Sequence, residues 1–422
     1  MMGRIQAGAL QFVLFIGAVI AVLLLAFVLL SYTHARFGKS ANRFVDTLKT
    51  ADLGVTYALK SGMRPGDTLD LDMGLGKGIM VKGVKEYWGV FEKYGVVATA
   101  SKHRFTKVAL AGGGIGPTSP VLYLQDNERP LIIVGTAKIT GNALLPKQGI
   151  RPGNISGHSY YHPQLVYGRQ GTSTKTLPKL GTGHLDYLKQ LLALNTSTNT
   201  LEERPLVRLT EIKNSFKRPT QFIRGHVLDL SETRITGNVV VWAAQKIRVD
   251  ASSMLTDVLL VAPEIEIGPG VKGNFQAVAS KRIDVGRNCE LYYPSALAVI
   301  ETVPVKKENT LGEPPNIYVA PRTQIRGTLL YLGDGETQRF SPQIKIDTDA
   351  HVTGEIHCAA NLELKGNLTG HLSTHSFIAL ENGSIYQNHL YNGTMDNRDL
   401  PLQFAGLTFE GTETKNLGKW LY

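Results

Sequence analysis

Histidine is the residue type of this chain best suited to chemistry, because imidazole titrates near neutral pH and binds transition metals. His357 and His375 lie 18 positions apart in the chain. If the chain between them makes one full turn of a repeating β structure, the two side chains stack about 5 Å apart on neighbouring strands and form a candidate metal site. A third ligand is not evident, and a stack of solvated polar side chains is the alternative.

A second candidate site is the segment SGHSYYHP, which contains His158, Tyr160, Tyr161 and His162. Tyrosine, histidine and glycine in one loop suit a site for a sugar or a metal. An ordinary surface loop is the alternative. The sequence therefore predicts a candidate ligand loop without fixing its ligand.

Signals for an enzyme are weak. Cys289 and Cys358 lie far apart and lack the spacing of metal ligands. Asp347, Asp349 and Glu355 are candidates for a polysaccharide lyase by proximity alone. Neither a nucleophile elbow nor a serine, histidine and acid arrangement is visible. We therefore predict no catalytic residue and no cofactor.

The composition favours a turn-rich β protein with more than one unit. The chain has 422 residues, of which 44 are glycine and 19% are charged, with a net charge of +10 and a pI of about 9.4. This length exceeds one ordinary domain. The basic residues are scattered rather than clustered, so we predict no nucleic-acid partner.

The strongest local signal is an apolar run at residues 12–30, with no polar side chain. As a helix it spans roughly 28 Å, about the thickness of a bilayer's hydrocarbon core. We expect a transmembrane anchor in residues 1–35, with the membrane as its partner. A cleaved signal peptide is the alternative, but its apolar region is usually shorter. The run resembles a pilin leader only loosely. It lacks the pilin pattern of a glycine cleavage site that is followed five residues later by a glutamate.

The charges beside this run give conflicting orientations. Arg36, Lys39 and Arg43 follow it, whereas Arg4 precedes it. Counting lysine and arginine places the body in the cytoplasm. Long domains translocate with little regard to that count, and a short segment before one span is the usual signal-anchor layout. We expect a single-pass inner-membrane protein with a periplasmic body.

A six-residue repeat organises the body. Ile247, Ile265 and Ile283 lie 18 positions apart, and so do the outward residues Lys246 and Glu264. Side chains at i and i+2 of a strand share a face, so each unit supplies two inward residues, and three units make one coil of a three-sided parallel β-helix with about 18 residues per coil. The inward columns run through Ile235, Val241, Ile247, Ser253, Leu259, Ile265, Val271, Ala277 and Ile283, and through Gly237, Ala243, Val249, Leu255, Val261, Ile267, Gly273, Ala279 and Val285.

The repeat and its interruptions divide a mainly-β chain into units. Stretches rich in glycine, serine, threonine and proline indicate loops ejected from a regular scaffold. The predicted units are the transmembrane anchor (1–35), a membrane-proximal helix and small β-rich region (36–130), a candidate first rung (131–145), an insertion with a short helix (146–221), β-helix coils (222–301), a loop insertion (302–316), further coils (317–390) and a C-terminal cap (391–422).

The hexads VDASSM, IGPGVK and VGRNCE, which begin at Val249, Ile267 and Val285, resemble those of the left-handed hexapeptide-repeat fold. The repeat also resembles the bactofilins, polymer-forming bacterial cytoskeletal proteins with a right-handed three-sided β-helix. The resemblance covers roughly residues 222–388 and leaves the hand of the coil open. The first family implies acyltransferases with a catalytic histidine, and the second implies self-association.

These observations together favour a structural role. We expect a non-enzymatic, membrane-anchored scaffold of the bacterial cell envelope, which associates with protein partners or with itself. The alternative is a β-helix protein that binds or degrades envelope polysaccharide.

Overall fold

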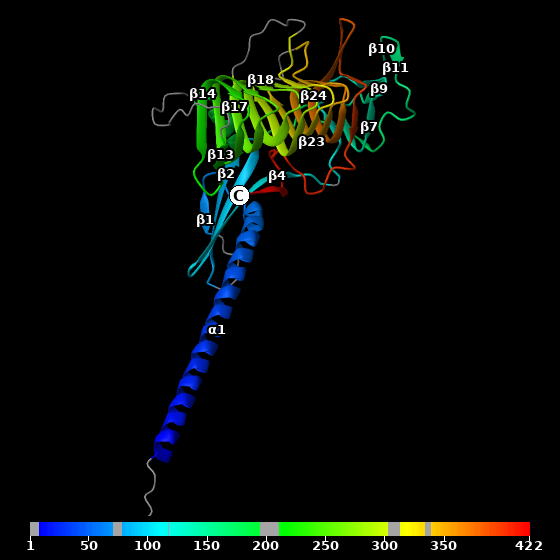
Figure 1. Cartoon of the computed structure of the whole chain (residues 1–422). Coiled ribbons are helices and arrows are strands. Elements are labelled where there is room, and N and C mark those ends of the chain that lie inside the picture. Colours follow the sequence, from blue (N-terminus) through cyan, green and yellow to red (C-terminus); the bar gives the residue numbers. More distant parts are fainter. Residues whose placement is uncertain (1–7, 71–77, 117, 195–210, 303–312, 334–338) are drawn as a thin grey trace, which may run out of the picture.

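The computed structural model describes residues 8–70, 78–116, 118–194, 211–302, 313–333 and 339–422. These residues form a mainly-β protein with 29 strands and two helices. Figure 1 shows a long helix that leads into a β-rich body. The body combines an antiparallel sheet beside the helix with a closed, largely parallel sheet, here named the parallel barrel.

The helix α1 (Gly8–Lys60) is one continuous element of 53 residues. Its first half is apolar and exposed, and within the described residues α1 is the helix long and apolar enough to cross a membrane. In its second half Ala51, Val55 and Ala58 are fully buried against the antiparallel sheet. The predicted anchor therefore continues without a break into the folded body.

The antiparallel sheet is a meander that the C-terminus completes. Its central strand pairs with both neighbours of the meander, and the last strand of the chain adds to the far side. The C-terminal strand therefore lies beside the strands that follow α1 in the sequence. The strands are β1 (Thr68–Asp70), β2 (Met80–Trp88), β3 (Phe91–Ala100), β4 (His103–Gly114), β28 (Ala405–Gly406) and β29 (Lys415–Leu421).

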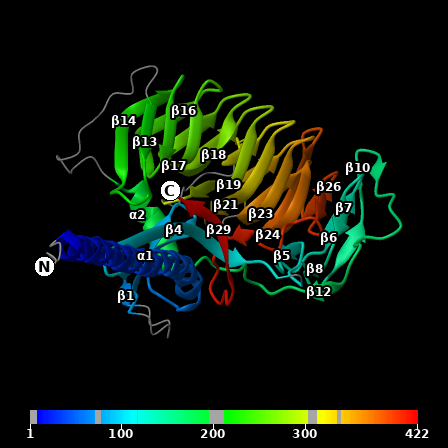
Figure 2. The ribbon, with the colours of Figure 1, turned by 60° about the horizontal axis from the view of Figure 1, so that its bottom comes forward.

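The parallel barrel repeats its pairing along the chain. Ile247 pairs with Ile265 and Ile265 with Ile283, so these strands are offset by 18 positions. Figure 2 shows the strands stacked side by side along the barrel. They are β5 (Leu122–Leu124), β7 (Lys138–Thr140), β8 (Ala143–Leu145), β12 (Gln170–Thr172), β13 (Glu211–Asn214), β14 (Gln221–Leu230), β15 (Arg234–Gly237), β16 (Val239–Val249), β17 (Met254–Ile267), β18 (Lys272–Val285), β19 (Glu290–Ile300), β20 (Ile317–Val319), β21 (Gln324–Leu332), β22 (Ile344–Ile346), β23 (His351–Leu364), β24 (Asn367–Glu381), β25 (Ser384–Gln387) and β27 (Thr394–Asp396).

Segments far apart in sequence meet at the end of the barrel away from β14 (Figure 2). There β5 pairs with β24, β7 with β27, and β8 with β5. The candidate first rung, residues 131–145, therefore comes early in the sequence but lies beside the last barrel strands in space. Two small sheets join this end: β6 (Leu131–Val134) with β9 (Ile150–Pro152) and β26 (His389–Tyr391), and β10 (Asn154–Ile155) with β11 (His158–Ser159).

Between the two ends of the barrel, the chain crosses its flank through residues 173–181, here named the strap, and helix α2 (Thr182–Leu192). The C-terminal segment, predicted as a cap, also lies on the flank: the N–H of Leu407 donates to Oε2 of Glu355 in β23 at 2.6 Å. It then returns to the antiparallel sheet. Most of the loop predicted at 302–316 lies outside the described residues.

The barrel core is aliphatic, but the strict period of six is wrong inside β17. Val258 belongs to the interior core, whereas Leu259 and Val261, both placed inside by the repeat, pack in an outer cluster with residues of α2. The cause is a bulge at Asp257, whose φ of +61° interrupts the pairing between β17 and β18. The period recovers by Ile265, which is again in the interior core.

The β2–β3 turn joins the antiparallel sheet to the barrel. Gln276 of β18 accepts a hydrogen bond from the N–H of Val90 at 2.9 Å and donates one to the carbonyl of Trp88 at 2.9 Å. Gly89 between them has a φ of +59°, and a Cβ there would lie 2.1 Å from Oε1 of Gln276. The turn therefore requires glycine, and it docks on one buried amide of the barrel.

Candidate functional site

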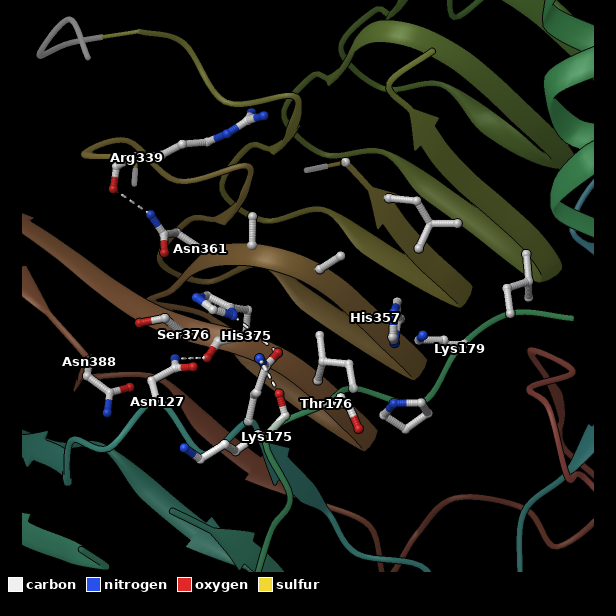
Figure 3. A pocket seen from close by; sticks show the side chains of 18 of the residues that line it. Asn127, Lys175, Thr176, Lys179, Arg339, His357, Asn361, His375, Ser376 and Asn388 are labelled. Carbon is white, nitrogen blue, oxygen red and sulfur yellow. Dashed lines mark hydrogen bonds between the residues drawn. The ribbon is translucent and has the colours of Figure 1, made fainter. Parts of the chain in front are cut away.

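A cleft of about 1030 Å³ lies between the outer face of the barrel and the strap. Strands β23 and β24 supply His357, Asn361 and His375, and the opposite wall comes from residues 125–129 and 175–182. Figure 3 shows His357 and His375 on the barrel wall, with Lys175, Thr176 and Lys179 facing them from the strap. The structure thus brings both members of the predicted histidine pair to one cleft.

The two histidines are not stacked as their spacing in the sequence predicted. His357 pairs with Ser373 across β23 and β24, and Glu355 pairs with His371, so the offset here is 16 positions. This offset is two residues smaller than the 18 between Ile247 and Ile265, and His375 therefore lies two positions beyond the partner of His357. Residues i and i+2 share a strand face, so the histidines are diagonal neighbours rather than a stacked pair.

His357 is a buried, neutral imidazole. Its Nδ1 lies 2.7 Å from Oγ of Ser373, and its ring lies beside that of Phe409 with centroids 5.1 Å apart. Burial lowers the pKa of His357 to about 4. Ser373 is buried and is not among the residues that line the cleft. The contact therefore orients the imidazole and does not present a serine nucleophile to a bound molecule.

His375 is held by the segment that follows β5. Its Nδ1 lies 3.1 Å from Oε1 of Gln125, and its carbonyl accepts a hydrogen bond from Nδ2 of Asn127 at 2.6 Å. Nε2 of Gln125 donates to the carbonyl of Lys175 at 2.8 Å. Burial lowers the pKa of His375. One glutamine therefore connects the barrel histidine to the strap, so that the two walls of the cleft are fixed to each other.

The cleft carries an excess of positive charge. Arg129, Lys175, Lys179 and Arg339 line it, against the single acid Glu410. Lys175 is paired with Glu128 and Arg339 with Glu301, both outside the lining, so the excess rests on Arg129 and Lys179. Lys179 is exposed and has no acidic partner among the described residues. The charge pattern suits a polar, anionic ligand.

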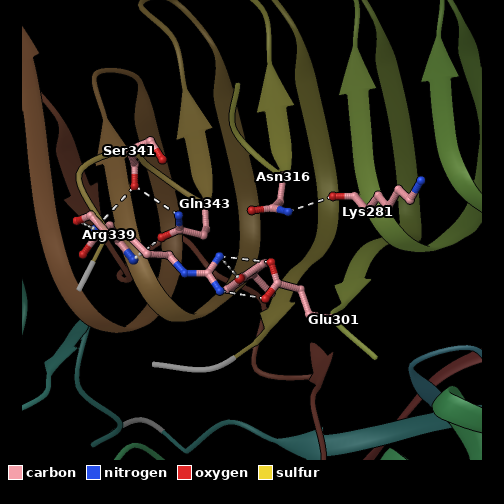
Figure 4. A network of polar contacts seen from close by, with 8 residues as sticks. Lys281, Glu301, Asn316, Arg339, Ser341 and Gln343 are labelled. Carbon is pink, nitrogen blue, oxygen red and sulfur yellow. Dashed lines mark hydrogen bonds and ion pairs between the residues drawn. The ribbon is translucent and has the colours of Figure 1, made fainter. Parts of the chain in front are cut away.

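A polar network fixes the Arg339 end of the cleft (Figure 4). Two nitrogens of the Arg339 guanidinium donate to the two carboxylate oxygens of Glu301, at 3.0 and 2.7 Å. The carbonyl of Arg339 accepts from Nδ2 of Asn361 at 2.8 Å, and the N–H of Asn361 donates to Oε1 of Gln343 at 3.0 Å. A bidentate pair of this kind holds the arginine in one orientation.

One buried atom of the cleft lacks a partner. Asn388 is 3% exposed, and its Nδ2 donates to the carbonyl of Pro130 at 2.8 Å. Its Oδ1 is buried and has no hydrogen-bond partner among the described residues. A buried polar atom without a partner costs free energy, and a donor on a bound molecule or a water would remove that cost.

The described residues supply no third ligand for the predicted metal site. Among the described residues no three histidine, cysteine, aspartate or glutamate side chains form a group that could hold a metal ion. A role for His357 and His375 as metal ligands stays a prediction, and their geometry equally suits hydrogen bonding to a ligand in the cleft.

The candidate ligand loop lies elsewhere. The rings of Tyr160 and Tyr161 lie beside His162 with centroids 5.6 and 4.3 Å away, and the Tyr160 hydroxyl donates to the carbonyl of Gln164 at 2.5 Å. His158 lies in the hairpin β10–β11, with its ring 6.2 Å from that of Tyr391. None of these residues lines the cleft. A ligand role for the loop stays a prediction.

The candidate lyase acids are not brought together at the cleft. Asp347 accepts a hydrogen bond from the Tyr318 hydroxyl at 2.9 Å, and Glu355 is buried under the C-terminal segment. Neither they nor Asp349 line the cleft. The sequence analysis did not identify Lys175, Lys179 or Asn388 as site residues. A lysine within an irregular insertion carries no sequence signal for the part of the fold that it will face.

Compared with protein-family models, curated proteins and solved structures, this chain matches none. Fold and site together define a mainly-β protein with a closed parallel barrel, a polar cleft and a helix able to cross a membrane. The resemblance to hexapeptide-repeat proteins and bactofilins rests on the hexads alone.

Proposed function

We propose that this protein is a non-enzymatic, membrane-anchored scaffold of the bacterial cell envelope, with its body in the periplasm and its anchor in the inner membrane. The observation that carries the proposal is the unbroken connection from the apolar helix through the antiparallel sheet to the barrel. Helix α1 runs from an exposed apolar half to a last segment whose Ala51, Val55 and Ala58 are buried against the antiparallel sheet, and Gln276 fixes that sheet to the barrel. A body attached in this way keeps a set height and orientation above the membrane.

We further infer that the barrel is a three-sided β-helix with about 18 residues per coil, like the two families that its hexads resemble. The regular pairing of Ile247, Ile265 and Ile283 supports this inference. Repeated coils of this kind are stiff because each one pairs with the next along its length. Self-association would use the outer edge of β14 at one end of the barrel.

The test is electron microscopy of the full chain in lipid nanodiscs. We expect one particle shape with the barrel at a fixed position relative to the disc. Gln276→Ala removes both side-chain bonds to the β2–β3 turn and should broaden that position, whereas Lys281→Gln on the exposed surface should not. A body scattered in position in the unaltered protein would contradict a rigid scaffold, and protease access in sealed cells would test the periplasmic side.

A second function is favoured by the cleft: binding of an acidic envelope polysaccharide. The cationic excess, the amide groups and the unpartnered Oδ1 of Asn388 support it. Titration with a uronate-containing polymer should show salt-sensitive binding that Lys175→Gln and Lys179→Gln weaken together and Lys281→Gln leaves intact. Equal binding of a neutral polymer would contradict an electrostatic cleft, and shortening of the polymer would show a degrading enzyme.

A further inference from the structure

A second hollow lies where α1 passes from its exposed apolar half to the folded body. It has a volume of about 920 Å³ and lies between α1 and the tip of the β3–β4 hairpin. We name it the juxtamembrane groove. Helix residues 33–46 form one wall, and Ile79 with residues 101–103 forms the other.

The juxtamembrane groove is strongly cationic. Arg36, Lys39 and Arg43 from the helix and Lys102 from the hairpin line it, against one acid, Asp46. None of the four cations has an acidic partner among the residues that the structure describes. Hydroxyl and amide groups of three further lining residues add neutral polar contacts; these are Thr33, Ser40 and Asn42.

The hairpin is docked so that cations from both elements face one space. Oγ of Ser40 lies 3.3 Å from Nε2 of His103. The ring of Phe44 meets those of His103 and Phe105 edge-on, with centroids 5.7 and 4.8 Å apart. These contacts hold the hairpin tip, and with it Lys102, at the level of helix residues 40–44.

The juxtamembrane groove lies at the level along α1 where the lipid headgroups are expected. If the apolar run ends at Leu30, Arg36 lies about 9 Å and Lys39 about 14 Å further along a helix that rises 1.5 Å per residue. The headgroup layer extends roughly 5–8 Å beyond the hydrocarbon core, and electrostatic attraction persists for about another 8–10 Å. Tyr32 and Phe37 are 62% and 75% exposed at this level, where aromatic rings are common in membrane proteins.

We propose that the juxtamembrane groove binds the phosphate-bearing headgroup of an anionic phospholipid in the leaflet that faces the body. The inference rests on the proposed anchoring of α1. Arginine and lysine on two elements surround the phosphate, and the neutral polar groups of the helix contact the rest of the headgroup. Occupancy ties the hairpin, and through it the antiparallel sheet, to the membrane surface.

The test uses the full chain in nanodiscs that contain equal amounts of phosphatidylcholine and phosphatidylglycerol. The protein is released into neutral detergent, and the lipids that stay bound are counted by mass spectrometry. We expect phosphatidylglycerol to be enriched over phosphatidylcholine. Removing a cation near the surface should lower the enrichment about fivefold, so Lys39→Gln with Lys102→Gln should lower it roughly 25-fold. Both side chains are exposed, and Lys281→Gln on the barrel is the matched control.

Three outcomes would overturn the proposal. Equal recovery of the two lipids by the unaltered protein would do so, as would unchanged enrichment in the double variant. Displacement of the bound lipid by millimolar inorganic phosphate would assign the groove to a soluble anion instead. Retention in nanodiscs of phosphatidylcholine alone reports on the anchor separately: a chain that leaves those discs disproves the anchoring itself, whereas a chain that stays but shows no lipid preference disproves only the groove.

Discussion

The parallel barrel and the antiparallel sheet bury their strands with different chemistry. The interior of the barrel is largely aliphatic, with Ile247, Ile265 and Ile283 paired in register and almost fully buried. The antiparallel sheet instead buries an ionic cluster. Glu92, only 2% exposed, lies 2.7 Å from Nζ of Lys85 and 2.8 Å from Nζ of the C-terminal Lys415.

The difference shows where each part is vulnerable. Inside the barrel, the aliphatic side chains of neighbouring strands pack on one another, and ion pairs such as Glu363 with Lys345 lie outside that core. In the sheet one carboxylate balances two buried ammonium groups, and it joins β3 to β29 from the other end of the chain. Burial raises the pKa of Glu92, but hydrogen bonds and charge from Lys415 and Lys85 outweigh it, so that the pKa is lowered overall.

Glu92→Ala should have the largest effect on stability. It leaves two partly buried lysines unpaired, which typically costs about 3–5 kcal/mol. Hydrogen exchange should rise in β3, β4 and β29 while the barrel strands keep their protection. Glu86→Ala on the same sheet is the control, because Glu86 is 52% exposed and pairs with Lys93 at the surface. Equal exchange in barrel and sheet would contradict separate modes of stabilisation.

Gly354→Ala should be among the most damaging small changes in the barrel. Gly354 has a φ of +143°, and a Cβ there would lie 1.9 Å from the carbonyl oxygen of Gly327. Backbone strain and overpacking together should cost about 3 kcal/mol. Gly383→Ala is matched in having a positive φ, +74°, but no atom lies within 4 Å of its Cβ position. It should cost about 1 kcal/mol in thermal unfolding, and equal losses would show that close packing at this corner is unimportant.

Much of the barrel, and little of the sheet, was predictable from sequence. In a repeat, the spacing of equivalent residues in the sequence fixes the register of neighbouring strands, so the pairing of Ile247 with Ile265 follows from their spacing. The bulge at Asp257 and the smaller strand offset between His357 and Ser373 depend on local backbone geometry, which no hydrophobic period encodes. The partnership of Glu92 with Lys415 joins residues more than 300 positions apart, and a single sequence holds no signal for it.

The cleft shows the same limit. The histidines lie on the regular strands. Their spacing in the sequence identified them as a candidate pair, although the predicted stacking of His357 on His375 was wrong. The strap lies in an irregular insertion, so its position over the barrel depends on tertiary contacts such as that from Gln125 to Lys175. A site with one wall made by a repeat and the other by a loop is therefore only half predictable.

Glu355 should make the docking of the C-terminal segment on the barrel dependent on pH. Burial raises its pKa to about 7, although the N–H of Leu407 partly offsets this. Since the folded pKa is above the ordinary value of 4.5, this contribution is fully present below pH 4.5 and is lost as the pH rises to about 7. The loss should be about 2–3 kcal/mol. Thermal unfolding from pH 5 to 8 should show it, and Glu355→Gln should flatten the profile; an equally steep profile would assign the dependence to another group.

Glu266→Ala should have the smallest effect and gives the sharpest contrast with Glu92. The backbone register places Lys246 opposite Glu264, yet Nζ of Lys246 lies 2.7 Å from Glu266 on the diagonal. Glu266 is 47% exposed, so this pair should contribute under about 1 kcal/mol, and less in high salt. Urea unfolding at low and high salt would measure it. A loss well above that range would mean that the barrel, like the sheet, depends on individual ion pairs, whereas a negligible loss would leave the aliphatic columns as the source of its stability.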